Sequence, residues 1–237
     1  MGVTRAPIAV ALDAPDLPTL SAWAQAVGPH VSTLKVGLET YLRDGRAAVA
    51  AARDSAPECH LFLDLKLHDI PATVAGAAGA VADLAPDYLT VHASGGRAMI
   101  AAAAEALPNT RVVAVTVLTS LSTEDLRALD LLGAGVDSAG ALAVHLAVTA
   151  VDAGARAIVC SPQEVADVRA ALSGRDVVLI TPGVRPAGAD AGDQRRVATP
   201  RQALDRGADL LVIGRPITGA TDPAAAAAAI ARELVDG

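Results

Sequence analysis

Aromatic residues are scarce in this sequence of 237 residues, since Phe, Tyr and Trp together contribute four side chains. Because 52% of the residues are hydrophobic, the chain still has enough apolar material for a large core, which must be built from aliphatic side chains and alanine. Cysteine is also rare. Cys59 and Cys160 lie far apart and lack any paired, metal-type spacing, which argues against a disulfide framework or a zinc site. We expect both to be small apolar fillers in reduced, intracellular surroundings.

Excess positive charge and long apolar runs are lacking as well. The formal net charge of −7 argues against a general nucleic-acid binder, which usually carries a basic surface, although it leaves room for a local anion pocket. No apolar stretch reaches membrane-spanning length without a charge or a proline. The first residues, MGVTRAPIAV, run directly into a strand-like segment and show no signal peptide. The sequence therefore predicts a cytoplasmic protein that binds neither nucleic acid nor membrane.

Lysine is nearly missing: of the nineteen basic residues only Lys35 and Lys66 are lysines, and the others are arginines. Arginine serves as surface charge, but its guanidinium group stays protonated at any working pH, whereas an ammonium group is able to give up a proton. Each lysine ends a short apolar run, in STLKVG and FLDLKLHD. Chance placement is one interpretation. The other, which we favour, is that lysine occurs here only where its proton chemistry is needed.

Short apolar runs alternate with alanine-rich segments of helical period along the whole chain. The strand-like runs occupy residues 8–13, 33–37, 60–66, 88–93, 111–118, 157–161, 177–184 and 209–215. The helical segments occupy residues 17–27, 42–54, 72–83, 97–106, 138–153, 162–172 and 199–206, and a last helix begins near Asp222 and Pro223. This alternation implies parallel strands, and eight such units predict an α/β fold, a (β/α)8 TIM barrel forming a single domain over residues 1–237. A doubly wound open sheet is the alternative.

Polar side chains gather at one end of the predicted strands. The residues at or just beyond a strand's C-terminal end are Asp13, Lys35, Asp64, Lys66, His92, Arg185 and Arg215. In a (β/α)8 barrel the loops at this end converge on the active site, so the sequence predicts the functional site there. For His92 we expect a structural role as a buried, hydrogen-bonded residue.

The segment LFLDLKLHDIP at residues 61–71 carries the strongest local pattern. Side chains of a strand alternate between its two faces, so Phe62, Asp64 and Lys66 share one face and four leucines share the other. The leucines require a helix layer, which turns Asp64 and Lys66 into the mouth of the barrel. A structural ion pair is the alternative, but on an apolar strand desolvation tends to consume the Coulomb gain of such a pair. We therefore interpret the pair as functional.

Two further charges extend this pair. Asp69 follows outside the strand, before a proline, and Lys35 ends the second strand, which gives the alternating set Lys35, Asp64, Lys66 and Asp69. Neighbouring carboxylates favour the ammonium form of Lys66, so this lysine is suited to act as a general acid and poorly suited to be a Schiff-base nucleophile. A substrate carboxylate beside Asp64 would be repelled, and a carbanion beside Lys66 would be stabilised and protonated. Decarboxylation needs both the repulsion at Asp64 and the stabilisation and protonation at Lys66. The scattered histidines indicate no metal site.

Glycine and arginine dominate the ends of the last two predicted strands. TPGVR at 181–185 ends the seventh strand, GDQRR follows at 192–196, and IGR at 213–215 ends the eighth. The loops after these two strands are the usual phosphate site of a (β/α)8 barrel. Glycine lets backbone N–H groups approach an anion, and arginine supplies bidentate donors. GDQRR alone is also compatible with a solvated loop, but together with Gly214 and Arg215 it predicts a phosphate site.

Taken together, these motifs resemble the orotidine 5′-phosphate decarboxylase family (the type with a DxKxxD motif), which catalyses the last step of de novo UMP synthesis. The resemblance runs through the whole chain. It is carried by ALD (11–13), KVG (35–37), DLKLHDIP (64–71), VHASGG (91–96), VTVLTS (115–120), TPGVR (181–185), AGDQRR (191–196) and VIGRPIT (212–218). The DxKxxD element alone is shared with related phosphate-binding barrels, and the other motifs make the resemblance specific. It implies conversion of orotidine 5′-phosphate to UMP and carbon dioxide without a metal or organic cofactor.

The resemblance also implies catalytic roles. Lys66 would protonate the vinyl carbanion left on the pyrimidine ring, and Asp64 would lie against the departing carboxylate. Lys35 and Asp69 would complete the catalytic set. In this family Asp69 and Thr73 would reach into the site of a partner subunit, so the resemblance implies a homodimer.

The implied substrate contacts fall into three groups. Those at the ribose are Asp13 and Lys35. Those at the pyrimidine are Thr119, Ser120 and Pro182. Those at the phosphate are Arg185, Gln194, Gly214 and Arg215, with Gln194 also reaching across to the base.

Two other functions are compatible with the same residues. A metal-dependent sibling would use the DxKxxD array on a sugar phosphate, with magnesium stabilising an enediolate. A non-catalytic barrel would bind a nucleotide without turning it over. Treatment with a chelator separates the first from a cofactor-independent decarboxylase, and turnover of orotidine 5′-phosphate separates the second.

Overall fold

The computed structural model describes residues 5–133, 135–185 and 198–235. Within these residues eight parallel strands close into a barrel in the order β1 to β8, with helices between consecutive strands. The strands are β1 (Ala6–Ala11), β2 (Val31–Gly37), β3 (His60–Leu67), β4 (Tyr88–His92), β5 (Arg111–Val115), β6 (Ala157–Val159), β7 (Val178–Thr181) and β8 (Leu210–Ile213). The predicted (β/α)8 barrel is confirmed, and the open doubly wound sheet is wrong.

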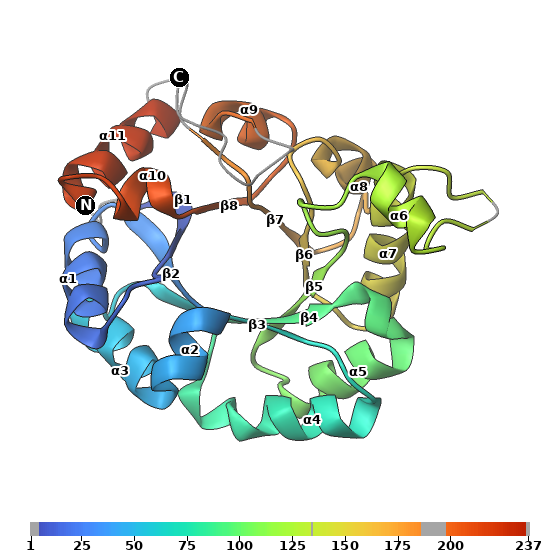
Figure 1. The fold of residues 1–237 in the computed structure, drawn as a ribbon, viewed down its shortest axis with the longest axis horizontal. Helices are drawn as coiled ribbons and strands as arrows, with labels where there is room; N and C mark the ends of the chain where they lie inside the picture. The colour runs from blue at the N-terminus through green and yellow to red at the C-terminus, as the bar shows by residue number, and fades with distance from the viewer. Residues whose placement is uncertain (1–4, 134, 186–197, 236–237) are drawn as a thin grey trace.

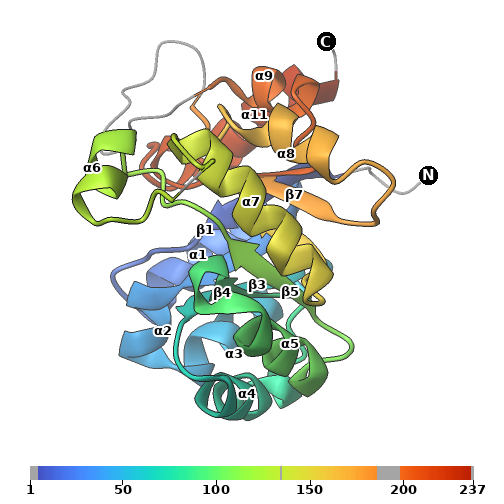
Figure 2. The same ribbon diagram turned by 90° about the vertical axis from the view of Figure 1, so that its right-hand side faces the viewer.

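The helices surround the ring of strands (Figure 1). They are α1 (Leu17–Val27), α2 (Leu38–Asp44), α3 (Arg46–Ser55), α4 (Pro71–Ala80), α5 (Gly96–Ala106), α6 (Thr123–Ala128), α7 (Ala139–Asp152), α8 (Val165–Ala171), α9 (Pro200–Asp205), α10 (Arg215–Thr218) and α11 (Pro223–Val235), with 3-10 turns η1 (Ala82–Leu84) and η2 (Ala93–Gly95). In the side view of Figure 2, α5 and α7 lie over the outside of β4 and β5. No helix in the described part of the chain is both long and apolar enough to cross a bilayer.

Two details of the helix prediction need correction. The segment predicted as one helix over residues 42–54 forms two helices, α2 and α3, because Gly45 between them has φ 58° and ψ −131°. Only glycine adopts such a backbone readily. In addition, α6 and α10 were not predicted. Helix α6 begins with a capping box, in which Ser122 accepts from the Asp125 N–H and the Asp125 carboxylate accepts from the Ser122 N–H.

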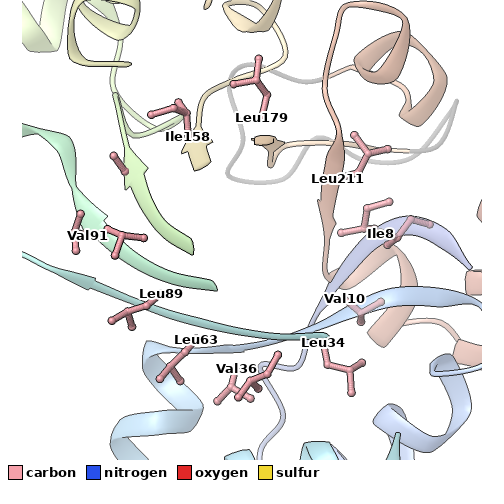
Figure 3. Close-up of a cluster of buried hydrophobic side chains, with 14 of the residues drawn as sticks. Ile8, Val10, Leu34, Val36, Leu63, Leu89, Val91, Ile158, Leu179 and Leu211 are labelled. Carbon is pink, nitrogen blue, oxygen red and sulfur yellow. The ribbon is translucent and has the colours of Figure 1, made fainter. Parts of the chain in front are cut away.

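Most buried apolar residues form two layers, one on each face of the barrel wall, and a third, small cluster joins α6 to α7. The larger layer lies between strands and helices and is aliphatic, as expected from the scarcity of aromatic residues; Figure 3 shows part of it, including Leu34, Leu63 and Leu89. The smaller layer fills the barrel interior and contains Phe62, packed against Tyr88 with ring centroids 5.6 Å apart. Along β3, the four leucines contact the helix layer while Phe62 points inward, which confirms the predicted alternation.

Candidate active site

A cavity of about 520 Å³ opens at the C-terminal end of the barrel. Val115, Val159 and Val212, from β5, β6 and β8, form part of its apolar wall, and Phe62 lies among its lining residues. The predicted site residues that line it are Asp13, Lys35, Asp64, Lys66, Thr119, Pro182, Arg185, Gly214 and Arg215. The structure therefore brings together residues that are up to about two hundred positions apart in the sequence, because parallel strands present their C-terminal ends at one rim.

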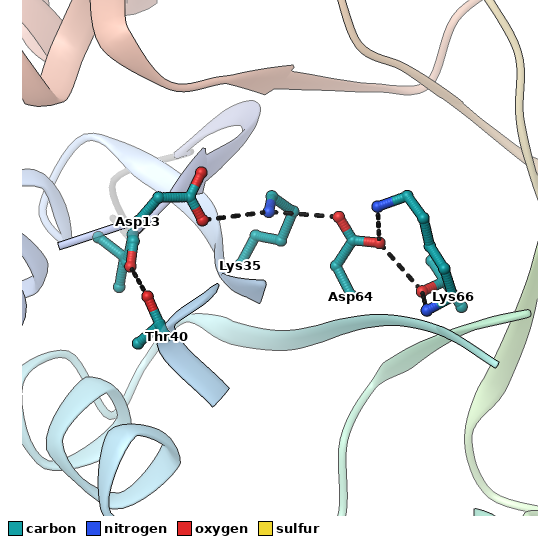
Figure 4. A network of polar contacts seen from close by, with 7 residues as sticks. Asp13, Lys35, Thr40, Asp64 and Lys66 are labelled. Carbon is teal, nitrogen blue, oxygen red and sulfur yellow. Dashed lines mark hydrogen bonds and ion pairs between the residues drawn. The ribbon is translucent and has the colours of Figure 1, made fainter. Parts of the chain in front are cut away.

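Four charged side chains form a charged row across one side of the cavity: Asp13, Lys35, Asp64 and Lys66 (Figure 4). Lys35 Nζ lies 3.8 Å from Asp13 Oδ1 and 3.2 Å from Asp64 Oδ2. Lys66 Nζ lies 2.8 Å from Asp64 Oδ1. Asp64 thus binds one lysine with each carboxylate oxygen, which fixes its orientation. The charges alternate in sign along the row, so every neighbour stabilises the next.

The backbone around β1 and β2 is shaped to admit this row. Gly37 ends β2 and pairs in register with Asp64. A Cβ atom at position 37 would lie 2.8 Å from Lys35 Nζ and 2.9 Å from Asp13 Oδ1, so any larger residue would displace both groups. Just beyond it, the hydroxyl of Thr40 donates to the Leu12 carbonyl oxygen at 2.9 Å, which anchors the segment that carries Asp13. Glycine here is required by close approach of side chains.

Strand β3 changes register where it carries the charges. Leu63 pairs with Leu89 of β4, and Leu67 pairs with Val91, so residues 64–66 lie opposite the single residue Thr90. Lys66 has a φ of 48°, in the left-handed region that residues other than glycine rarely adopt. The Lys66 N–H donates to Thr90 Oγ1 at 2.8 Å, and the Thr90 hydroxyl donates to Asp64 Oδ1 at 3.0 Å. This irregular stretch directs both Asp64 and Lys66 into the cavity.

The electrostatics of Asp64 follow from its position in the row. Burial raises the pKa of the Asp64 carboxyl, but Lys35 and Lys66 lower it, and hydrogen bonds from Lys66 and Thr90 lower it further. The net result is a pKa below the ordinary value for aspartate. Asp64 is therefore an anion under working conditions, although only 9% of its surface is exposed.

The opposite side of the cavity carries the predicted phosphate site. Pro182, Gly183 and Arg185 line it after β7, and Gly214 and Arg215 line it after β8. The backbone of this region is held by an isolated parallel bridge between Val184 and Ala198. Two guanidinium groups and two glycines around one end of a cavity provide the donors that an oxyanion such as phosphate needs. Gln194, the remaining predicted phosphate contact, lies outside the described residues.

Three predicted residues lie away from the cavity of their own chain. Asp69 and Thr73 are exposed, and the Asp69 carboxylate accepts from the Ile70 N–H at 2.6 Å. Ser120 is exposed and, unlike Thr119, does not line the cavity. Within one chain the alternating charges therefore continue from Lys35 to Asp13, and Asp69 is not part of them. The roles assigned to Asp69 and Thr73 concern a partner subunit and stay predictions.

Sequence reasoning overlooked Thr90, Glu39 and Gly37. Thr90 is completely buried and joins Asp64 to the Lys66 backbone; its signal is a polar residue at an inward-facing position of the apolar run YLTVH. Glu39 lines the cavity from the first turn of α2. Gly37 belongs to the KVG motif, but its importance follows only from the distances to Lys35 and Asp13.

His92 lies near the row without belonging to it. Its ring is half-buried, and its centroid is 5.3 Å from that of His68. Burial lowers the pKa of His92, and His68 and Lys66 lower it further, against the opposing effect of Asp64. The neutral imidazole is thereby favoured. The structural role expected for His92 stays a prediction.

Across the described ranges, no group of three or more His, Cys, Asp or Glu side chains is arranged to hold a metal ion. Neither Cys59, which is half-buried, nor Cys160, which is buried, forms a disulfide bond among the described residues.

Comparison with known proteins places this geometry in a family. The model of the orotidine 5′-phosphate decarboxylase / HUMPS family matches residues 6–230. An orotidine 5′-phosphate decarboxylase of Thermobifida fusca is 68% identical over 229 residues, covering 97% of this chain and 96% of the relative. One from Frankia casuarinae is 55% identical over 248 residues, covering 97% and 88%. The crystal structure of orotidine 5′-phosphate decarboxylase from Lactobacillus acidophilus superimposes with a TM-score of 0.81 at 34% identity, covering 97% and 99% of the two chains.

These matches extend over nearly the whole length of the chain and of its relatives, and they confirm the resemblance carried by the motifs. Because the barrel fold, the charged row and these matches agree, we conclude that the chain belongs to the orotidine 5′-phosphate decarboxylase / HUMPS family.

Proposed function

We propose that this protein is an orotidine 5′-phosphate decarboxylase, which converts orotidine 5′-phosphate to UMP and carbon dioxide in pyrimidine biosynthesis, with Lys66 as the proton donor. The relatives from T. fusca and F. casuarinae carry the name of this activity, at 68% and 55% identity. The observation that carries the mechanism is the alternation of Lys35, Asp64 and Lys66 at 2.8 to 3.2 Å on one side of the cavity, with two arginines on the other.

The arrangement of charges orients the substrate. The phosphate binds Arg185 and Arg215, with the backbone of Gly214 close by. The ribose lies beside Asp13 and Lys35, whose opposite charges match hydroxyl groups that both donate and accept. The pyrimidine then lies between the two ends of the cavity, near Thr119 and Pro182. Its carboxylate group faces Asp64.

The chemical step needs one bond to break and one to form. The bond between the ring and the carboxylate breaks, its electron pair stays on the ring carbon, and carbon dioxide leaves as a neutral molecule. Lys66 Nζ then gives one proton to that carbon, and the amine recovers a proton from water. An ammonium group already held in place stabilises the developing carbanion without reorganising at the moment of reaction. Lys66 meets this requirement because Asp64 holds its ammonium group at 2.8 Å.

Asp64 contributes in two ways to this step. Its carboxylate remains charged, so it disfavours a second carboxylate beside it and favours the loss of that group as neutral carbon dioxide. It also positions Lys66 and, through Lys35, connects the reacting end of the cavity with Asp13. The chemistry of these residues requires neither a metal nor an organic cofactor.

We further propose that the site is completed by a second copy of the chain, which supplies Asp69 and Thr73. Residues 68–73 are all exposed in the single chain, and Ile70 between them has 66% of its surface exposed. An exposed apolar side chain of this size, close to an exposed carboxylate and an exposed hydroxyl, is what an interface would cover. In a symmetric dimer each chain would place these residues in the other's cavity.

The single-domain organisation and the cytoplasmic location expected from the sequence belong to the same proposal. A family match that runs over residues 6–230 supports one domain. Cell fractionation tests the location.

The activity is tested by following the loss of ultraviolet absorbance of orotidine 5′-phosphate, together with release of carbon dioxide and chromatographic identification of UMP. Turnover with formation of UMP is expected. Binding of the nucleotide without turnover would instead support the non-catalytic barrel. The same assay after extensive EDTA treatment should give unchanged activity, and complete loss that magnesium restores would support the metal-dependent sibling.

The shared site is tested by mixing two inactive variants, Lys66→Ala and Asp69→Ala, after unfolding or by co-expression. A hybrid dimer would hold one cavity with both native residues, so random mixing should recover about one quarter of the wild-type activity. No recovery would mean that Asp69 acts within its own chain, and an Asp69→Ala variant that is active by itself would mean that Asp69 has no role.

A further inference from the structure

Strand β3 carries the reacting lysine on an unfavourable backbone. Three residues, from 64 to 66, lie opposite the single residue Thr90 of β4, and Lys66 takes a φ of 48° within this mismatch. A left-handed conformation is costly for a residue with a Cβ atom, and it persists only where surrounding contacts hold it. A contact from the neighbouring strand β4 is therefore needed to hold the backbone of Lys66 in this conformation.

The hydroxyl of Thr90 makes both of the contacts that this position requires. Its oxygen accepts the Lys66 N–H at 2.8 Å, at the point where the pairing of β3 and β4 changes register. Its proton is donated to Asp64 Oδ1 at 3.0 Å. A hydroxyl has a single proton, so the donation to Asp64 also fixes the direction of the O–H bond. Thr90 has no exposed surface, which keeps water from replacing either contact.

These contacts close a ring of three residues. Asp64 Oδ1 receives the Thr90 hydroxyl at 3.0 Å and the Lys66 ammonium at 2.8 Å, while Thr90 holds the backbone of Lys66. Lys66 is thus held at both ends of its side chain: at the backbone through Thr90, and at Nζ through Asp64. A flexible lysine would otherwise distribute its ammonium group over many rotamers, and a displacement of about 1 Å at a reacting group is able to cost a hundredfold in rate.

We propose that Thr90 is a positioning residue of the decarboxylase, whose hydroxyl sets the placement of Lys66 Nζ for proton transfer by fixing the Lys66 backbone and the Asp64 carboxylate together. The inference rests on the proposed function, because it assigns Thr90 to the proton-transfer step. Thr90 acts through Lys66 and Asp64 and does not line the cavity, so it has no contact with the substrate.

Replacement by valine isolates the hydroxyl. Thr90→Val keeps the shape of the side chain but leaves both the Lys66 N–H and one Asp64 oxygen without this partner. Turnover of orotidine 5′-phosphate should fall roughly ten- to a hundredfold in kcat, the range of one lost hydrogen bond to a charged group. KM and the affinity for UMP should change by less than about threefold, because the phosphate contacts lie across the cavity. Thr90→Ser, which keeps the hydroxyl, should restore most of kcat.

Thr110 supplies a matched control. Its hydroxyl donates to the Pro86 carbonyl oxygen at 2.7 Å, and the residue is buried just before β5, at the end of the barrel away from the cavity. Thr110→Val removes a buried, hydrogen-bonded hydroxyl in the same way, and it should lower the unfolding midpoint in urea while leaving kcat unchanged.

The outcomes separate the inference from the function on which it rests. If the wild-type protein does not turn over orotidine 5′-phosphate, the proposed function itself fails. If the wild type is active and Thr90→Val keeps its kcat, or if Thr110→Val loses as much, the positioning role is overturned. Loss of kcat in Thr90→Ser equal to that in Thr90→Val would overturn it as well.

A second pair of variants decides the case if Thr90→Val does not fold. Thr90→Ser and Thr90→Cys lose the same methyl group, but a thiol is a weak hydrogen-bond partner. Serine should keep nearly full kcat, and cysteine should lose roughly tenfold or more. Equal rates for the two would contradict the proposal. Amide hydrogen exchange at Lys66 provides a readout independent of activity, and it should be faster in Thr90→Val and Thr90→Cys than in the wild type and in Thr90→Ser.

Discussion

Removal of the Lys66 ammonium group should abolish nearly all turnover while the protein stays folded. Lys66 binds only one oxygen of Asp64, at 2.8 Å, and Asp64 keeps Lys35 at 3.2 Å and the Thr90 hydroxyl at 3.0 Å after the change. The carboxylate left behind is therefore still paired. The expected loss of stability for Lys66→Ala is about 1.5–3 kcal/mol, the value for one hydrogen bond to a charged group, and smaller than the cost of removing every partner of a buried charge.

The loss of rate should be far larger. A positioned general acid contributes about 10²- to 10⁴-fold, and a preorganised charge at the developing anion contributes about 10²- to 10³-fold. Since one ammonium group provides both, kcat should fall at least about 10⁴-fold, or about 5.5 kcal/mol in the activation barrier. Ultraviolet absorbance of orotidine 5′-phosphate measures the rate, and calorimetry with UMP should show affinity within about threefold of the wild type, because Arg185 and Arg215 are untouched.

Lys66→Arg provides the control for charge alone. The guanidinium group keeps a cation opposite Asp64, but it does not release a proton at working pH. Its kcat should therefore also fall by orders of magnitude. A rate for Lys66→Ala within tenfold of the wild type, or full activity in Lys66→Arg, would refute the assignment of Lys66 as the proton donor.

Three further changes probe the rest of the site. Gly37→Ala should lower kcat/KM roughly ten- to a hundredfold with little change in melting temperature, because the new methyl group would lie 2.8 Å from Lys35 Nζ and displace it; wild-type kinetics would show that the row tolerates the shift. Arg215→Ala should lower kcat/KM roughly tenfold or more and weaken UMP binding by a similar factor; unchanged values would place the phosphate elsewhere. Burial raises the pKa of Asp64, and the lysines and hydrogen bonds outweigh it, so its folded pKa is depressed. The difference in free energy of unfolding between the wild type and Asp64→Asn should therefore be constant above about pH 4 and shrink as the pH falls through the folded pKa. Urea titrations in which this difference disappears between pH 7 and pH 5 would contradict the expectation.

The fold and the core of the site followed from patterns that depend on the chain alone. Four leucines alternating with Phe62, Asp64 and Lys66 determine which face of β3 contacts the helices, and polar residues at successive strand ends meet because the strands are parallel. The charged row needed only these two rules, which act within one strand or between strands of known direction.

The parts that were missed depend on distances between elements. Thr90 gains its role because three residues of β3 lie opposite it, and a shift in register between two strands leaves no pattern in either strand. Gly45 separates α2 from α3, but the residues on both sides of it are good helix formers. The helical period therefore continues across the break, and the sequence pattern does not show it. The place of Asp69 depends on a second chain, and no pattern within one chain shows how two copies pack.

A crystal structure with a UMP-like anionic analogue bound tests the central claim most directly. We expect Lys66 Nζ within about 3 Å of the ring carbon that loses the carboxylate, a distance suited to proton transfer, with Arg185 and Arg215 on the phosphate. An ammonium group turned away from the ring, or a nucleotide bound outside this cavity, would contradict the account.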